Sequence, residues 1–343
     1  MQYEVTIGIP VYKAVDYIEK TIESALVQSF PSIEFLVLDD CGMDGSIDIV
    51  ERIKNEHPRG KDIRILRHNE NCGVGVARNT ILDEAKGKYL FFLDSDDIIN
   101  YNTIQILMNE IQNVDADIVY GSWERIDYID KTPPMQSVYP YMLFTMPNQL
   151  AMYAFKNYSS FRISVCNCLM NISFLREAHL HFVDAFFWED MAFTYEMVTK
   201  VRRAVLLPNI TYYYLCHNNS LSHFQERKVL NKDEILNNAS VVSYLKDKFG
   251  SLRDIPYAPY LNYNLGMNSF YVVLYVINHR SIIRPKVSSA ELKLFLKSPL
   301  DFLDILKYRG RFWGNIALWI MSKLPGSLSL LLVRVVGELK KVR

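Results

Sequence analysis

Apolar runs alternate with helical apolar faces over roughly the first 120 residues of the chain. Short apolar runs predict strands that are buried on both faces, and the segments between them repeat apolar residues at helical spacing. We expect strands at residues 5–10, 34–38, 63–66, 89–93 and 117–120. We expect helices at residues 16–29, from 46, through 76–79 and at 103–111. Strands that alternate with helices predict a parallel sheet with right-handed crossovers.

Three residues are expected to mark where these elements begin and end. Pro10 should end the first strand, because proline has no N–H to donate to a neighbouring strand. Asp16 and Ser46 should cap the first two helices, because their side chains can accept hydrogen bonds from the free N–H groups of a first helical turn.

The alternation fades after about residue 120. Residues 148–230 mix helical patterns with an extended aromatic segment at 210–214. Residues 231–279 have helical spacing, and Asn231 is a suitable start for that region. The tail from 288 is apolar and basic, with a break at Pro325 and Gly326. We therefore expect the second part of the chain to be mainly helical.

Two of the predicted strands run directly into carboxylates. Strand 89–93 is followed by Asp-Ser-Asp-Asp at 94–97, and strand 34–38 by two aspartates. The carboxyl ends of parallel strands share one edge of a sheet, where open α/β sheets bind ligands. Clustered carboxylates repel one another, and Mg²⁺ or Mn²⁺, which would bring a diphosphate with it, relieves that repulsion. An acidic turn in which Asp97 caps the next helix is the alternative.

A third acidic pair, Glu189-Asp190, follows the aromatic residues 186–188. Aromatic surroundings remove water from a carboxyl group and raise its pKa, which suits a general base. The alternative is a helix that begins at these residues, because acidic side chains are favoured at helix N-termini.

Composition and charge exclude several other classes of protein. The chain has 343 residues, half of them hydrophobic, and its charges balance to zero, which argues against nucleic acid as the main partner. Five cysteines without a CxxC pair indicate a reducing compartment. The first residues lack the pattern of a signal peptide, and prolines and asparagines interrupt the uncharged stretch 255–279. We therefore expect a cytoplasmic protein without a transmembrane helix.

Five segments, taken in this order, resemble the inverting family-2 glycosyltransferases with the GT-A fold. They are Ile9-Pro10-Val11-Tyr12, Leu38-Asp39-Asp40 with Asp44 and Ser46, 73–79 with Arg78, Asp94-Ser95-Asp96-Asp97, and Trp188-Glu189-Asp190. The resemblance implies a GT-A-like α/β fold with a doubly wound, mainly parallel sheet, and a helical C-terminal region. It places the glycosyltransferase domain at 1–225, with a nucleotide-binding half at 1–120 and an acceptor half at 121–225. The helical region would then span 226–343.

The resemblance also implies a nucleotide-sugar donor, a Mn²⁺ or Mg²⁺ cofactor and an acceptor that is a glycan or a lipid-linked glycan. Asp190 would be the general base, with Glu189 as a supporting acid. Asp96 would bind the metal directly, and Asp94 would contact the ribose and the metal. Asp97 would cap the following helix.

The remaining candidates surround the nucleotide. Pro10 would turn the chain across the nucleotide site, where Val11 and Tyr12 would cover the base, although ordinary loop packing also explains Tyr12. Asp40 can accept a hydrogen bond from N3–H of uracil, with Asp39 and Ser95 as further binding residues. Arg78 would face the base, the diphosphate or the acidic cluster, and a surface salt bridge is its alternative.

The segment 212–222 departs from the family pattern. Many family members have an arginine where Leu215 stands here. His217 either reaches the diphosphate in its place or leaves the contact unmade. The same histidine is a candidate metal ligand or an ordinary loop residue with a structural hydrogen bond.

Aromatic and basic residues alternate in the tail, for example at Lys307, Arg311, Trp313 and Lys323. This pattern suits the anionic inner face of the plasma membrane. Packing on the rest of the chain or on a second subunit is the alternative.

The sequence thus predicts metal-dependent, inverting sugar transfer in cell-surface polysaccharide synthesis, with a preference for a uridine nucleotide. A nucleotidyltransferase should show a basic phosphate loop after its first strand, where only Lys13 is found. A non-catalytic binding protein would not need the acidic pair at 189–190.

Overall fold

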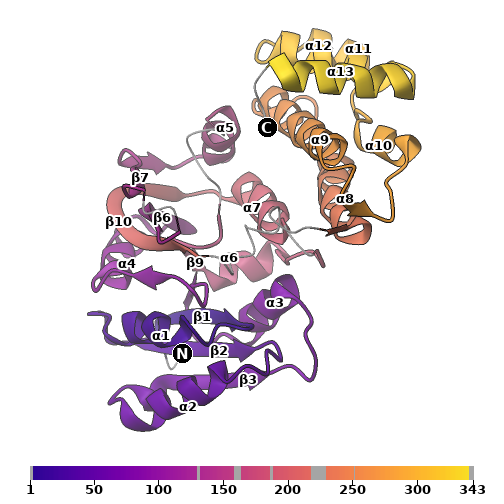
Figure 1. Ribbon diagram of the computed structural model, residues 1–343. Helices are drawn as coiled ribbons and strands as arrows, with labels where there is room; N and C mark the ends of the chain where they lie inside the picture. The colour runs from indigo at the N-terminus through magenta and orange to yellow at the C-terminus, as the bar shows by residue number, and fades with distance from the viewer. Residues whose placement is uncertain are drawn as a thin grey trace. The chain divides into compact units, whose positions relative to one another are not determined.

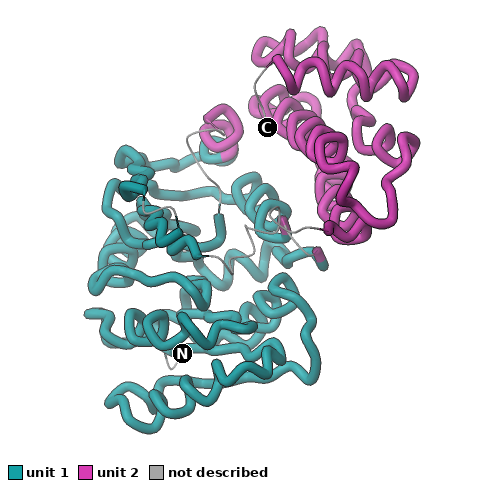
Figure 2. The backbone as a smooth tube through the Cα atoms, in the orientation of Figure 1, with its two compact units in different colours: residues 1–150, 160–184, 189–220 teal, residues 151–159, 185–188, 221–343 magenta. Residues whose placement is uncertain are grey.

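Figure 1 shows a computed structural model of the chain, which describes residues 3–129, 132–157, 164–185, 188–217, 229–250 and 252–339. The chain divides into two compact units, coloured teal and magenta in Figure 2. The first unit, here called the sheet unit, comprises Met1–Leu150, Ser160–Asp184 and Glu189–Ser220. The second, the helical unit, comprises Ala151–Ser159, Ala185–Trp188 and Leu221–Arg343.

The sheet unit is built on one large mixed sheet. Its strands are β1 (Val5–Val11), β2 (Ile33–Asp39), β3 (Ile63–Arg67), β4 (Tyr89–Phe92), β5 (Ile98–Ile99), β6 (Ile118–Asp127), β7 (Met135–Ser137), β8 (Met142–Phe144), β9 (Cys168–Asn171) and β10 (Ala204–Cys216). Its helices are α1 (Ile18–Leu26), α2 (Ser46–Glu56), η1 (Gly60–Asp62), α3 (Val74–Glu84), α4 (Thr103–Val114), α6 (Ile172–Glu177) and α7 (Glu189–Lys200). Helix α5 (Gln149–Lys156) begins in this unit and continues in the helical unit.

The first half of the sheet confirms the predicted α/β pattern. Strands β3, β2, β1 and β4 lie side by side in this order and are all parallel. β1 and β4 are buried along their whole length, as short apolar runs predict. The expected helices also form, although α1 and α4 begin or end a few residues from the predicted bounds.

The second half of the sheet differs from the prediction. Strand β9 lies between β4 and β6 and is antiparallel to both, so the predicted fifth strand does not lie beside the fourth. β10 then pairs with β6 in parallel and contains the aromatic segment that was expected to be extended. No apolar run of ordinary strand length marks β9, which has only four residues.

Several predicted element ends are also wrong. β1 continues through Pro10 to Val11, so the proline does not end it. The residue that precedes α1 is Tyr17, without a side-chain hydrogen bond, and the residue that precedes α2 is Gly45, with a positive φ of 88°. Asp16 and Ser46 are therefore not the caps, because the backbone enters these helices at other residues.

The helical unit contains the helical region that the sequence predicted. Its elements are β11 (Leu230–Asn231), α8 (Lys232–Phe249), α9 (Ala258–Asn278), β12 (Ile283–Arg284), α10 (Ser289–Phe295), α11 (Phe302–Leu306), α12 (Phe312–Lys323) and α13 (Gly326–Leu339). Asn231 caps α8 by accepting a hydrogen bond from the Asp233 N–H at 2.9 Å, as expected. The predicted break at Pro325 separates α12 from α13.

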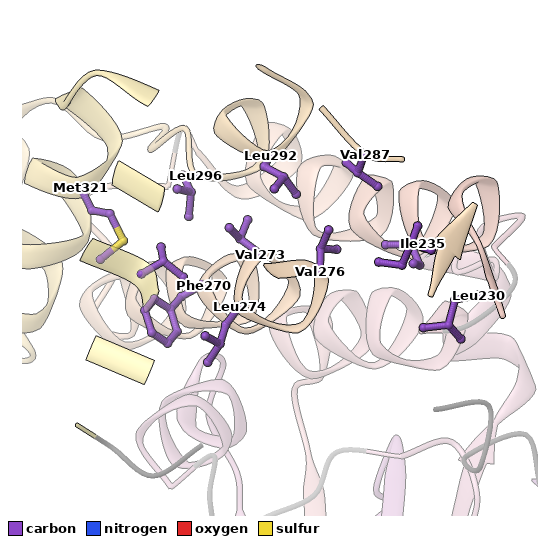
Figure 3. Packing of buried hydrophobic residues seen from close by; sticks show 12 residues of the cluster. Leu230, Ile235, Phe270, Val273, Leu274, Val276, Val287, Leu292, Leu296 and Met321 are labelled. Atoms are coloured by element: carbon purple, nitrogen blue, oxygen red, sulfur yellow. The ribbon is translucent and has the colours of Figure 1, made fainter. Parts of the chain in front are cut away.

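One face of α9 supplies much of the core of the helical unit. Figure 3 shows Phe270, Val273 and Leu274 of this helix beside Leu292 and Leu296 of the α10 segment and Met321 of α12, all of them buried. None of the helices in the described ranges is both long enough and apolar enough to cross a membrane.

Candidate active site

Three neighbouring strands of the sheet unit end at the same edge. β2, β1 and β4 are adjacent and parallel, and the hydrogen bonding continues just beyond them. The Asp40 N–H donates to the Val11 carbonyl at 2.9 Å, and the Leu93 N–H donates to the Gly8 carbonyl at 3.0 Å. The loops that follow these strands are therefore brought together, as predicted from the parallel arrangement.

Asp40 is buried and holds the loop that follows β3. One carboxylate oxygen accepts from the Cys72 N–H at 2.9 Å and lies 2.7 Å from Nδ1 of His68. The other oxygen accepts from the Gly73 N–H at 2.9 Å. A contact between Asp40 and a nucleobase would have to share or replace one of these bonds.

Asp39 is more exposed than Asp40 and also holds a loop. Its Oδ1 accepts from the Cys41 N–H at 3.0 Å, and its Oδ2 lies 3.9 Å from Nε of Arg67. Both aspartates therefore stabilise loops, and the assignment of Asp40 to the base, with Asp39 as support, stays a prediction.

Of the three candidate nucleotide-binding residues at the end of β1, Pro10, Val11 and Tyr12, Tyr12 alone presents a large side-chain surface. Its exposed fraction is 42%, whereas Pro10 and Val11 are buried within β1. The loop after Tyr12 is held by two hydrogen bonds to the loop that follows β2. Ser46 Oγ accepts from the Ala14 N–H, and Asp44 Oδ2 accepts from the Val15 N–H, both at 3.0 Å. This explains physically why an Asp44–Ser46 pair follows β2.

Arg78 connects two acidic centres that lie far apart in sequence. Its Nη2 donates to Oδ1 of Asp94 at 2.8 Å, and its Nη1 donates to Oε1 of Glu189 at 2.6 Å. The guanidinium is buried, so the surface salt bridge considered for it is wrong. Burial alone would lower the pKa of Arg78, but the two carboxylates raise it above its ordinary value.

A glycine permits this connection. A side chain at Gly75 in the first turn of α3 would come within 2.8 Å of the Val183 carbonyl oxygen and 3.4 Å of Cβ of Glu189. The start of α3 can therefore approach the start of α7 closely, which places Arg78, one turn further along α3, beside both carboxylates.

The acidic stretch after β4 sends its three carboxylates to three different partners. Asp94 binds Arg78, and its second oxygen accepts from Sγ of Cys166 at 3.3 Å. Asp96 Oδ2 lies 2.8 Å from Nε2 of His217. Ser95, between them, uses its carbonyl to accept from the Thr21 hydroxyl at 3.0 Å.

Asp97 is buried and does not cap a helix, contrary to the prediction. It accepts from the Tyr212 hydroxyl at 2.7 Å and from the Leu215 N–H at 2.8 Å. β5 follows it, and the next helix begins only at Thr103, after Asn102. Burial raises the pKa of Asp97 well above its ordinary value. Asp97 therefore links the acidic loop to β10. At Leu215, where many family members have an arginine, the group that donates to Asp97 is the backbone N–H.

A divalent cation fits the chemistry of Asp96 and His217. A carboxylate oxygen and an imidazole nitrogen that lie 2.8 Å apart are suitable ligands for Mn²⁺. The Asp96 side chain is partly exposed, whereas His217 is buried. Tyr17 stacks on the His217 ring with 3.8 Å between ring centroids, which fixes the plane of the imidazole. Asp94, which faces Arg78, is less directly placed, so its role as a ligand stays a prediction.

A different trio of potential ligands is more compact. Within the described ranges, ligand atoms of three residues come within 4.8 Å of one another at Asp40, His68 and Cys72, and not at the 94–97 stretch. Two of these potential ligand atoms, Oδ1 of Asp40 and Nδ1 of His68, are hydrogen-bonded to each other. This trio could not be predicted from the sequence, because no metal-binding spacing connects its members.

The predicted base and its neighbour begin α7. Glu189 is buried, and Asp190 is partly exposed. Loss of water raises the pKa of both carboxyl groups, against the opposing effect of Arg78. The preceding Trp188 has a positive φ of 67°, and residues 186 and 187 lie outside the described ranges. The two interpretations of this acidic pair, a reactive carboxyl and a helix start, are therefore compatible.

Sequence reasoning missed Tyr212 and Cys166. The Tyr212 hydroxyl donates to Asp97 and accepts from the Asp94 N–H at 3.3 Å, so one side chain orients both ends of the acidic stretch. The antiparallel pairing of β10 with β5 brings it there. A run of three tyrosines does not show which one faces the site, and no short-range pattern points to Cys166.

The fold and the acidic edge define a protein of the GT-A class, in which an α/β sheet presents carboxylates beyond its parallel strands. The family model described as "Glycosyl transferase family 2" matches residues 6–178. This is half of the chain, and the chain therefore belongs to glycosyl transferase family 2.

Curated relatives agree with this family. The putative teichuronic acid biosynthesis glycosyltransferase TuaG of Bacillus subtilis is 44% identical over 93 residues, which are 27% of this chain and 36% of TuaG. The UDP-Glc:alpha-D-GlcNAc-diphosphoundecaprenol beta-1,3-glucosyltransferase WfaP of Escherichia coli is 27% identical over 240 residues, which are 70% of this chain and 88% of WfaP. The chain thus spans only about a third of the length of TuaG.

Two solved structures share the fold. TarS 1–349 of S. aureus, in complex with UDP-GlcNAc, has a TM-score of 0.63 at 18% identity. The match covers 93% of this chain and 90% of the TarS chain. The mannosyltransferase PcManGT of Pyrobaculum calidifontis, in complex with GDP-Man and Mn²⁺, has a TM-score of 0.54 at 13% identity, with 100% and 89% covered. These likenesses confirm the predicted GT-A-like fold.

Proposed function

We propose that this protein is a metal-dependent, inverting glycosyltransferase. It transfers a sugar from a nucleoside-diphosphate-sugar, with UDP as the preferred nucleotide, to a glycan or lipid-linked glycan in cell-surface polysaccharide synthesis. The observation that carries the proposal is the buried Arg78, which holds Asp94 at the nucleotide edge and Glu189 beside the predicted base in one network. In this proposal the two acidic centres have different tasks in one site.

The relatives support the choice of substrates. TuaG is named for teichuronic acid biosynthesis, and WfaP for transfer of glucose from UDP-Glc to a diphosphoundecaprenol-linked sugar. TarS has been solved with UDP-GlcNAc, and PcManGT with GDP-Man and Mn²⁺. The lipid-linked acceptor in the name of WfaP supports the predicted acceptor class.

Residues at the sheet edge bind the donor in this proposal. Tyr12 covers the base, and Asp39 and Asp40 offer acceptors to it. Asp96 and His217 would hold Mn²⁺ or Mg²⁺, with Asp94 beside them. When bound, the ion neutralises the charge that develops on the departing diphosphate.

Asp190 acts on the acceptor. Its carboxylate takes the proton from an acceptor hydroxyl, and that oxygen forms a bond to the anomeric carbon of the donor. The bond between this carbon and the diphosphate oxygen breaks on the opposite face, so the configuration is inverted. Arg78 forms an ion pair with each of Glu189 and Asp94. Glu189 in turn supports the charge balance around Asp190.

The cellular site follows from the acceptor. A lipid-linked acceptor lies at a membrane, and nucleotide-sugars are cytoplasmic, so we place the reaction at the inner face of the plasma membrane. The five cysteines are all unpaired, which suits a reducing compartment.

A thermal-shift screen tests the proposal. Nucleotide-sugars that bind the folded protein raise its Tm by mass action. We expect UDP-sugars to raise the Tm with Mn²⁺ present and not with EDTA, and the stabilising donor to release UDP faster when a glycan acceptor is added. A panel of nucleotide-sugars that leaves the Tm unchanged in Mn²⁺, or stabilises equally in EDTA, contradicts the proposal.

A further inference from the structure

Helix α13 presents four large apolar side chains to solvent. Leu328, Leu331, Val335 and Leu339 are all exposed, the last with an exposed fraction of 78%. Their spacing places them along one helical face. Other residues of the helix pack on the helical unit, namely the buried Ser329, Val333 and Gly337 and the partly buried Leu330, Leu332 and Val336. The exposed face is therefore apolar, whereas a surface helix of a water-soluble protein ordinarily presents polar residues to solvent.

Close packing holds the buried side of α13 on the helical unit. A side chain at Gly337 would come within 2.5 Å of Cδ1 of Leu274 on α9, so the two helices approach each other closely at this point. Nζ of Lys293 donates to Oγ of Ser329 at 2.9 Å and to the Met321 carbonyl at 3.1 Å, which fixes the corner between α12 and α13. These contacts fix the orientation of α13, so its outward-facing leucines remain exposed in the folded unit.

Helix α12 also presents apolar side chains to solvent, although its Met321 is buried in the core. Trp313 has an exposed fraction of 79%, and Ala317 and Ile320 are exposed at helical spacing from it. The buried Asn315 donates to the Pro259 carbonyl at 2.9 Å, and a side chain at Gly314 would come within 2.5 Å of the Tyr263 ring. Leu303 and Leu306 of the preceding α11 are exposed as well.

Charge favours an anionic partner for these helices. Residues 301–343, which include all of α11, α12 and α13, contain eight lysines and arginines and three acidic residues, whereas the whole chain is neutral. Lys307, Arg309 and Arg311 lie directly before α12, and Lys323 ends it. A second copy of the chain would bring two basic surfaces together, which repel, whereas anionic lipid attracts them.

We propose that the exposed faces of α11, α12 and α13 form a docking surface for an anionic lipid membrane. The apolar side chains enter the boundary between headgroups and acyl chains, and the basic residues contact the anionic headgroups. Because no described helix can span a membrane, the contact is peripheral and reversible. The inference stands on the helical unit alone and does not depend on the proposed sugar transfer.

Vesicle binding tests the proposal with the full-length protein. Flotation with vesicles of phosphatidylglycerol and phosphatidylcholine should recover the protein, and vesicles of phosphatidylcholine alone should recover far less. Each basic residue near an anionic surface contributes about fivefold to the affinity, so 0.5 M salt should release the protein. The tryptophan emission should shift to the blue on binding, and Trp313→Phe should reduce that shift while leaving binding largely intact.

Exposed-residue variants separate the surface from the fold. Trp313→Ser should weaken vesicle binding by about 10-fold, and Trp313→Ser with Leu328→Ser and Leu331→Ser by about 100-fold or more. Val27→Ser with Met146→Ser, at two exposed apolar positions of the sheet unit, is the matched control and should bind as the parent does.

Two outcomes overturn the proposal. One is equal vesicle binding by the parent and the triple variant while both remain folded. The other is a parent protein that ignores anionic vesicles but dimerises in sedimentation velocity through the same three residues, which would assign the surface to a second copy of the chain.

Discussion

The two units of this chain treat apolar and charged side chains in opposite ways. The sheet unit buries its large apolar residues in β1, β2 and β4 and collects carboxylates at one edge. The helical unit has an apolar core that includes Met321 and Val333, but its last two helices also expose leucines and a tryptophan beside basic residues. Each departure from the ordinary pattern, buried charge in one unit and exposed apolar surface in the other, coincides with a proposed binding surface.

The largest expected effect concerns the buried charge of the sheet unit. Arg78→Met leaves Glu189 and Asp94 without their cation, and breaking a buried ion pair costs about 3–5 kcal/mol of unfolding free energy. Arg52→Met is the matched control, because Arg52 bridges Glu19 and Glu56 at the surface and should change stability little. Urea denaturation measures the unfolding free energy of both variants. Equal losses of unfolding free energy would show that the ion pairs of Arg78 stabilise the fold no more than a surface ion pair does.

The next effect concerns the two acids that begin α7. Asp190→Asn keeps the shape of the side chain but cannot accept a proton, so transfer should fall by at least ~10²-fold with near-normal donor affinity. Steady-state kinetics beside donor titrations give both quantities. If Asp190→Asn transfers at close to the parent rate and Glu189→Gln is inactive, the base is the neighbour. If both variants are fully active, the mechanism is wrong.

A smaller effect is expected in the pH profile. Burial raises the pKa of Asp190 and raises that of Glu189 to about 7. A base works in its deprotonated form, so a raised pKa means that kcat falls, at most about tenfold per pH unit, as the pH drops through the raised range. A rate that stays constant down to the ordinary range of aspartate, near pH 4, would contradict a base with a raised pKa.

The smallest effect separates the two faces of α13. Leu331→Ser should change the unfolding free energy by no more than about 0.5 kcal/mol, because Leu331 is exposed. Val333→Ala, two residues further on, removes methyl groups from a buried position and should cost more, on the order of 1–2 kcal/mol. Equal costs in chemical denaturation would show that the leucine face is covered within the protein.

The parallel half of the fold could be predicted because its signals are local. β1, β2, β3 and β4 are short apolar runs, and the carboxylates that follow two of them are adjacent in sequence. β9 could not be predicted, because it has only four residues and gains its position by pairing with β4 and β6, both distant in the chain.

The same limit applies to the site. The residue types at Asp40, Asp96 and Asp190 pointed to nucleotide, metal and base chemistry, but their partners depend on tertiary structure. Arg78 and Glu189 are 111 positions apart, and Asp97 and Tyr212 are 115 apart. The local sequence predicts that Asp97 caps the next helix. Only the complete sheet shows that β10 supplies the hydrogen-bond donors to Asp97.

The most direct test of the central claim, that Asp96 holds the donor's metal while Asp190 serves the acceptor, is calorimetric titration with UDP. The parent protein and Asp190→Asn should both bind UDP in Mn²⁺ and lose that binding in EDTA. Asp96→Asn, which is nearly isosteric, should stay folded and show no Mn²⁺-dependent binding. Unchanged Mn²⁺-dependent binding of UDP by Asp96→Asn would contradict the account.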